Sequence, residues 1–256
     1  LDTLLEEASR WQDLVATLKQ RIAATSAEEV RIGLQHRLAG MARASGQQDE
    51  AIAAYEALAA TDPSDPDPLE ALVELLEDAE PAKLCDALER LAERLPSASA
   101  ERADALLRAA RICAGPLKAP DRAADHYLKA FDANPAEDEA FRFVERNAQG
   151  DAALLQRLYR RRSEGVEAGP ARVVVLRKLA EVCVQLGKTG EARAALETAL
   201  ATDEGNEILQ RELIAVCEDA NDIPGFQRAA THRLKSDVPR VERVMLVRKL
   251  ARFTVE

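Results

Sequence analysis

Residues 37–63 read RLAGMARASGQQDEAIAAYEALAATDP, and this stretch decides the fold. Apolar residues recur at helical spacing on both sides of a polar break that contains a glycine, and the second half ends at Asp62 and Pro63. The same order returns in residues 108–135 (RAARICAGPLKAPDRAADHYLKAFDANP) and in residues 178–203 (KLAEVCVQLGKTGEARAALETALATD). Two helices joined by a short break form a hairpin, and a hairpin that recurs at a fixed period predicts a helical repeat architecture.

The period is set by matching residues in the second helix of each hairpin. These pairs are Ala51 with Tyr55, Ala123 with Tyr127, and Ala192 with Leu196. Tyr55 and Tyr127 are 72 residues apart, but another helix pair lies between them in the same order, so the period is two hairpins of about 35 residues each. We predict hairpins at residues 1–26 (partial), 28–64, 66–96, 99–135, 137–166, 169–204, 206–238 and 240–256 (half).

These hairpins resemble the tetratricopeptide repeat, a helix–turn–helix unit of about 34 residues. In residues 32–63 the resemblance is carried by Leu38, Ala39, Ala51, Tyr55 and Pro63, whereas Leu58 departs from the usual alanine. In residues 173–204 it is carried by Leu179, Ala180, Ala192, Leu196 and Ala199, and Glu204 replaces the usual proline. The alternate hairpins keep the apolar spacing only.

The resemblance implies an all-α fold, a right-handed α-solenoid of about 14–15 helices stacked as antiparallel hairpins, with no β-sheet and with one concave surface. We expect residues 1–256 to form a single solenoid. Residues 240–256 supply one helix without its partner, and a solenoid needs polar capping helices at its ends. We therefore expect the chain to be a fragment of a longer array.

The composition agrees with helix and argues against several classes of function. Aromatic residues make up 4% of the chain, whereas strands favour aromatic and β-branched residues. The formal net charge is −10, so we expect no nucleic-acid partner and no attraction to anionic membranes. No apolar run is long enough to cross a membrane, so we also expect no membrane insertion.

No motif predicts catalysis, a cofactor or a metal site. The four cysteines (Cys85, Cys113, Cys183 and Cys217) lie far apart and the histidines are dispersed, so ligand pairs at zinc-site spacing are absent. Cys113 and Cys183 fall at near-equivalent places in successive repeats, and we interpret them as core residues. Unpaired cysteines favour a cytoplasmic location, and a periplasmic one stays open because we expect the true N-terminus to be missing.

Charge is distributed unevenly along the chain. Residues 1–80 carry 17 acidic and 6 basic side chains, a balance of −11, whereas residues 223–256 carry 8 basic and 3 acidic ones, a balance of +5. A basic cluster with one aromatic residue, Tyr159, is formed by Arg157, Arg160, Arg161 and Arg162. It could bind phosphate or an acidic peptide, or it could be neutralised by Glu164, Glu167 and acidic residues of neighbouring helices.

In tetratricopeptide proteins the first helix of each hairpin lines the concave groove. The resemblance therefore implies concave-face candidates for partner binding, which are His36, Arg43, Arg111, Arg177, Glu181, Arg248 and Arg252. Gly40 and Glu181 stand where the chaperone-binding members of the family have an asparagine, so a carboxylate clamp of that kind is not predicted. A mixed lining of arginine and glutamate indicates charge-assisted contacts to a protein segment.

Three hypotheses about function follow from these features. The leading one is a non-enzymatic scaffold that binds a protein or peptide partner on its concave face. An alternative is a structural spacer that associates with itself head to tail, through its acidic N-terminal and basic C-terminal parts. A further alternative is a regulatory repeat region of a larger enzyme, which would depend on sequence outside these 256 residues.

Overall fold

The computed structural model describes residues 11–77 and 80–253. These residues form fourteen α-helices and no β-strand. The helices are α2 (Trp11–Ala24), α3 (Glu28–Ala44), α4 (Gln48–Thr61), α5 (Asp67–Leu75), α6 (Pro81–Arg94), α7 (Ala100–Ala114), α8 (Pro120–Ala133), α9 (Asp138–Asn147), α10 (Ala152–Gly165), α11 (Pro170–Gln185), α12 (Thr189–Thr202), α13 (Glu207–Asp219), α14 (Ile223–Arg233) and α15 (Arg240–Phe253). The prediction of an all-α helical repeat fold is confirmed.

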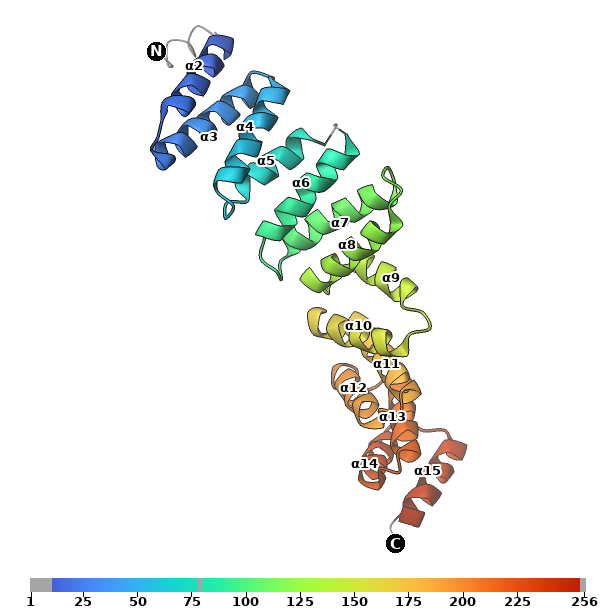
Figure 1. Ribbon diagram of the computed structural model, residues 1–256. Helices are drawn as coiled ribbons and strands as arrows, with labels where there is room; N and C mark the ends of the chain where they lie inside the picture. Colours follow the sequence, from blue (N-terminus) through green and yellow to red (C-terminus); the bar gives the residue numbers. More distant parts are fainter. Residues whose placement is uncertain (1–10, 78–79, 254–256) are drawn as a thin grey trace. The chain divides into compact units, whose positions relative to one another are not determined.

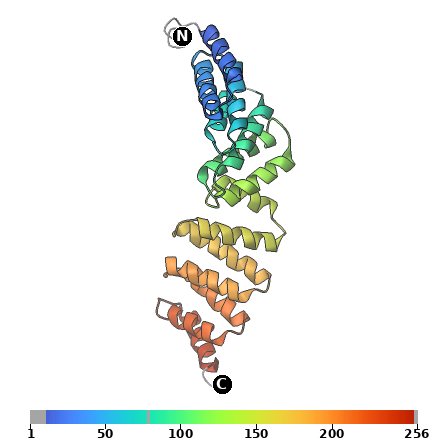
Figure 2. The same cartoon turned by 60° about the vertical axis from the view of Figure 1, so that its left-hand side comes forward.

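The chain divides into two compact units, Leu1–Asn134 and Pro135–Glu256, which we call the N-terminal and the C-terminal unit. Among the described residues the N-terminal unit holds α2–α8 and the C-terminal unit holds α9–α15. Within each unit, helices that follow one another in the sequence lie side by side in both views (Figures 1 and 2). The single solenoid over residues 1–256 stays a prediction, and residues 1–10 of the partial first hairpin lie outside the described part of the chain.

Five hairpins share one kind of turn between their first and second helix. In each turn a single residue has a positive φ angle, and these residues are Gly46 (73°), Lys118 (49°), Gly150 (96°), Gly187 (71°) and Asn221 (52°). At Gly187 the following residue, Lys188, donates its backbone N–H back to the carbonyl of Cys183 over 2.8 Å. This bond satisfies a carbonyl at the end of the first helix and reverses the chain within a few residues.

The starts of several helices are fixed by side chains that accept hydrogen bonds from the first turn. Ser99 caps α7, Asp151 caps α10, Asn206 caps α13 and Asp222 caps α14. Short polar side chains at these positions satisfy backbone N–H groups that have no partner within the helix. Residues at the helix starts therefore determine these hairpin boundaries locally.

The core of the N-terminal unit is made of small and straight-chain residues. Ala39 of α3 and Ala51 of α4 are fully buried. Leu14, Leu18 and Leu58 belong to the same core cluster as Ala39, and Tyr55 packs against this cluster. Each buried leucine stabilises the fold by about 1.5–3 kcal/mol, and the alanines let the helices approach closely enough for that burial.

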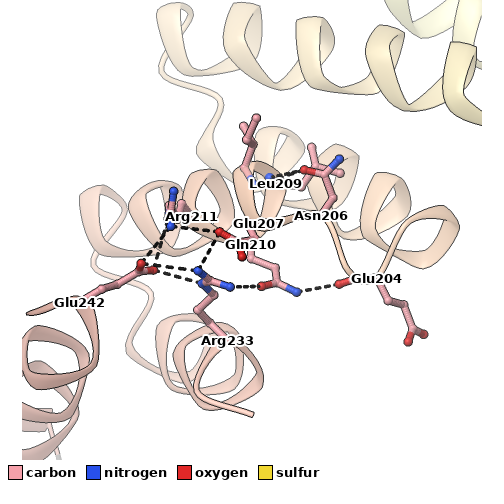
Figure 3. A network of polar contacts seen from close by, with 9 residues as sticks. Glu204, Asn206, Glu207, Leu209, Gln210, Arg211, Arg233 and Glu242 are labelled. Atoms are coloured by element: carbon pink, nitrogen blue, oxygen red, sulfur yellow. Dashed lines mark hydrogen bonds and ion pairs between the residues drawn. The ribbon is translucent and has the colours of Figure 1, made fainter. Parts of the chain in front are cut away.

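The C-terminal unit contains a fully buried arginine, Arg233, at the end of α14 (Figure 3). Its guanidinium donates to Glu242 of α15 (Nε to Oε1, 3.1 Å), to Glu207 of α13 (Nη2 to Oε2, 3.2 Å) and to Gln210 (Nη1 to Oε1, 3.3 Å). The exposed Arg211 contacts the same two glutamates from the other side. A buried guanidinium needs such a complete set of acceptors, and here the set joins three helices.

Candidate functional site

The seven residues predicted to line the concave face all lie on first helices of their hairpins. They are on α3 (His36, Arg43), α7 (Arg111), α11 (Arg177, Glu181) and α15 (Arg248, Arg252), and all of their side chains are exposed. They are divided between the two units, so each unit presents its own subset. Whether they bind a partner stays a prediction.

Two of these arginines are engaged with the following hairpin. Arg43 donates to Glu74 of α5 over 2.5 Å, and Arg177 donates to Glu212 of α13 over 2.7 Å. The hydrogen bond that Arg43 donates to Glu74 holds the pKa of Arg43 above its usual value, which reflects the same pairing. These two side chains are therefore engaged in contacts inside the protein.

The two pairs belong to a series of ion pairs that join equivalent helices of neighbouring hairpins. Their members are 29–35 residues apart, close to the length of one hairpin. Further pairs of this series are Glu56–Arg90, Glu77–Arg108, Glu89–Arg122, Glu145–Lys178, Arg160–Glu191, Arg193–Asp222, Arg211–Glu242 and Glu218–Lys249. Most of them are exposed, so each contributes about 0–1 kcal/mol, but together they align the stacked hairpins.

The four arginines of the predicted basic cluster on α10 have different surroundings. Arg160 pairs with Glu191 of α12, and Arg161 pairs with Glu164 one turn along the same helix. Arg162 is buried, donates to Asp138 and to the Pro135 carbonyl, and stacks over the Phe141 ring at 4.7 Å. Arg157 is exposed. The four arginines therefore do not form one continuous cationic surface.

A groove with an acidic rim lies on the first-helix side of the N-terminal unit. It has a volume of about 470 Å³ and lies between α5 and α7, with residues of α6 as its floor. Leu88, Leu91 and Leu95 contribute the apolar floor. The charged residues of the rim are Glu70, Glu74, Glu101, Asp104 and Arg108.

The charges of this groove are unbalanced. Arg108 donates to Glu77 and Glu74 accepts from Arg43, so these two side chains are already paired. Within the described part of the chain, the exposed carboxylates of Glu70, Glu101 and Asp104 form no ion pair. The apolar floor and the unpaired carboxylates of this groove together favour a ligand that carries positive charge and apolar side chains.

A second cleft, of about 330 Å³, lies in the C-terminal unit beside α12 and α14. Leu200, Ala201, Leu213 and Ala229 line its wall. Charged groups of both signs also line it, for example Glu197 and Arg228, so the cleft indicates no particular charge of a ligand.

One group among the described residues has the composition of a metal site. It consists of Cys85 on α6, Cys113 on α7 and His126 on α8, whose ligand atoms all lie within 4.8 Å of one another. Sequence reasoning missed this group because its members are separated by 28 and 13 residues and only helix packing brings them together. It missed the groove because α5 lies in a weakly matched hairpin; the balance of −11 in residues 1–80 includes Glu70 and Glu74 of the rim but not Glu101 and Asp104.

Comparison with known proteins gives a family match over part of the chain. Residues 32–75 match the model of the tetratricopeptide repeat, whereas curated protein sequences give no match. A tetratricopeptide repeat protein from Parabacteroides merdae is 15% identical, covering 100% of this chain and 96% of that one, with a TM-score of 0.38. MamA is 18% identical, and the match covers 65% of this chain and 95% of MamA with a TM-score of 0.33. PilW, a type IV pilus biogenesis factor, is 14% identical, and the match covers 78% of this chain and 90% of PilW with a TM-score of 0.32.

Stacked antiparallel hairpins define the class: this is a helical repeat protein, whose fold is that of a scaffold for protein–protein interaction. The match at residues 32–75 specifies this part of the chain further, since the model that it fits is that of a tetratricopeptide repeat. No helix in the described residues has the length and apolar character required to span a membrane.

Proposed function

We propose that this protein is a non-enzymatic scaffold that binds a basic, partly apolar segment of a partner protein in the groove between α5 and α7. The observation that carries this proposal is the pairing of an apolar floor with the unpaired carboxylates of Glu70, Glu101 and Asp104. A helix or extended segment with lysine or arginine beside leucine would place its apolar side chains on the floor and its cations on the rim. The family resemblance, which places first helices on the concave face, supports the same location.

The test uses a fluorescent peptide library of basic amphipathic sequences and measures anisotropy with the full chain. The groove variant combines Glu101→Gln with Asp104→Asn, and its control combines Asp86→Asn with Glu93→Gln on α6, which changes the net charge equally at exposed positions outside the groove. We expect the groove variant to weaken binding about tenfold or more and the control to change it less than threefold. Equal weakening by both variants would show that only net charge matters, and the proposal would be wrong.

A second candidate function is head-to-tail self-association, and the surface of α15 favours it. Val241, Val244 and Val247 of this helix are exposed, as are Arg243 and Arg248. This surface has the chemistry that the acidic groove should accept, so a second copy of the chain could supply the segment. Sedimentation velocity at low and high salt distinguishes the two functions, because association through opposite charges weakens as salt rises. A monomer at every salt concentration removes self-association and leaves the scaffold proposal intact.

A further inference from the structure

Two thiols and an imidazole meet in the interior of the N-terminal unit, between α6, α7 and α8. The Sγ atoms of Cys85 and Cys113 are 3.4 Å apart, and both side chains are fully buried. A ring nitrogen of His126 lies within 4.8 Å of both sulfurs. Two thiolates bound to one tetrahedral Zn²⁺ at about 2.3 Å each lie about 3.8 Å apart, so the sulfurs are already close to that separation.

His126 has the environment of a ligand rather than of a core residue. Its side chain is 4% exposed, and neither ring nitrogen makes a hydrogen bond of good geometry, although buried polar atoms normally have a partner. Nε2 lies 2.8 Å from Oε1 of Glu89, a distance that fits an ion pair but at an angle unsuited to a hydrogen bond. Metal-binding histidines commonly have a carboxylate beside the imidazole that orients the ring, and Glu89 lies in such a position.

The surrounding charges suit a divalent cation. Glu89 accepts a hydrogen bond from Arg122 over 2.7 Å, so this carboxylate is already balanced. A Zn²⁺ ion would neutralise two thiolates and leave the cluster without net charge, which a buried site requires.

A surface cleft lies next to the histidine of this group. A cleft of about 360 Å³ beside α6 and α8 is lined by Glu89, Arg122, Asp125 and His126 among others. His126 therefore faces both the two sulfurs and a solvent-accessible space. Acidic and basic side chains both line this cleft, so its charge neither attracts nor repels a cation.

The repeat supplies an internal comparison. The helices α10, α11 and α12 of the C-terminal unit correspond to α6, α7 and α8, offset by 71, 70 and 69 residues at their starts. Cys113 corresponds to Cys183, but Gln156 replaces Cys85 and Ala195 replaces His126. There Gln156 donates to Cys183 over 3.5 Å and to Glu191 over 2.5 Å, so the equivalent polar groups satisfy one another.

From this geometry we infer that Cys85, Cys113 and His126 bind one thiophilic divalent metal ion, Zn²⁺ by the match of ligand types, with the fourth position open and with Glu89 orienting the imidazole. Soft thiolate and imidazole ligands in tetrahedral arrangement select zinc over magnesium or calcium. Metal ligation requires thiolates, so binding releases the thiol protons of Cys85 and Cys113 to solvent.

The test uses the full chain, stripped with a chelator and kept reduced, and titrates it with Co²⁺ and with Zn²⁺ in competition with a chromogenic chelator. We expect one equivalent of metal, with the thiolate charge-transfer and tetrahedral absorption of Co²⁺. The variants Cys85→Gln and His126→Ala should lose this absorption, and they introduce residues that the other unit already holds at these positions. Glu89 is a positioning residue, so Glu89→Gln should weaken the affinity for the metal about 10–100-fold. The control Cys183→Ala should still bind one equivalent of metal.

A measurement on the unaltered chain protects the test against variants that fail to fold. Pulsed alkylation with mass spectrometry reads each of the four cysteines separately, and all four are buried. We expect Zn²⁺ to slow the labelling of Cys85 and Cys113 and to leave Cys183 and Cys217 unchanged. The inference is overturned if the wild-type chain binds no Co²⁺ or Zn²⁺, or if Zn²⁺ protects none of these thiols or all four equally.

Discussion

Replacing Arg233 with methionine should release α15 from the C-terminal unit. Methionine keeps the length and apolar stem of the buried side chain but removes every hydrogen-bond donor. Arg233 donates to two carboxylates and one amide, and hydrogen bonds to charged groups contribute about 1.5–3 kcal/mol each. Because Glu207 is half exposed and regains water, we expect a net loss of about 3 kcal/mol, or roughly 100-fold in the opening equilibrium of α15.

The matched control is Arg211→Met. Arg211 contacts the same carboxylates, Glu242 at 3.0 Å and Glu207 at 3.1 Å, but its side chain is 50% exposed. Exposed pairs contribute about 0–1 kcal/mol, so this variant should change the opening equilibrium less than about fivefold. The two variants therefore separate the effect of burial from the effect of pairing with these glutamates.

Hydrogen exchange measured by mass spectrometry on peptides from Arg240–Phe253 reports the opening of α15 directly, and urea unfolding reports the whole chain. We expect fast exchange in α15 of Arg233→Met and near-native exchange in Arg211→Met. Equal exchange in the two variants, or a change below about 1 kcal/mol for Arg233→Met, would refute the argument that the buried network holds this helix.

Three further predictions concern local features. Gly187→Ala should destabilise the chain by about 1–2 kcal/mol in urea unfolding, because alanine disfavours a φ of 71°, whereas Gly190→Ala in open space on α12 should be neutral or stabilising. Hydrogen bonds from Arg233 hold the pKa of Glu242 below its ordinary value of 4.5. Helix α15 should therefore stay docked above pH 4.5 and be released as the pH falls through the lower pKa that Glu242 has in the folded protein. Amide hydrogen exchange of α15 in acid measures this release, and Glu242→Gln should remove the pH dependence. Tyr159→Phe removes a 2.8 Å hydrogen bond to a glutamate that Lys178 still pairs, so thermal unfolding should show a loss of only about 0.5–1.5 kcal/mol.

The fold was predictable because its determinants are local and repeated. Helix α4 ends at Thr61, directly before Asp62 and Pro63, and proline cannot continue a helix. Ala39 and Ala51 could be placed in the core from their spacing alone, and both are fully buried. Such signals depend on residues a few positions apart, and each occurs in several copies of the repeat.

The turn of the α7–α8 hairpin shows where local reasoning was incomplete. The break in residues 108–135 contains a glycine, Gly115, but the residue with positive φ is Lys118. Lysine adopts this conformation at a cost of about 1–2 kcal/mol, which the packing of α7 against α8 must outweigh. The glycine alone therefore does not locate the turn, whereas Pro120, the first residue of α8, marks where the second helix begins.

The candidate sites were less predictable because they depend on the register between hairpins. Whether Arg43 is free or paired depends on the side chain one hairpin further along, here Glu74. The groove likewise combines Glu70 of α5 with Glu101 of α7, which are 31 residues apart. That spacing recurs through the ion pairs of the whole chain, so a sequence search at 29–35 residues could have found these partners.

Comparison of the two equivalent interfaces shows what the repeat constrains. In the N-terminal unit Glu89 of α6 pairs with Arg122 of α8, and in the C-terminal unit the corresponding Arg160 pairs with Glu191, so the signs are exchanged. Both interfaces therefore place opposite charges across the stack, but which helix carries which charge is not fixed. The position beside this pair is less constrained still, because alanine fills it in one unit and His126 in the other. A ligand set can arise at such a position without disturbing the stack, because the ion pair that aligns the helices is already satisfied by its own partner.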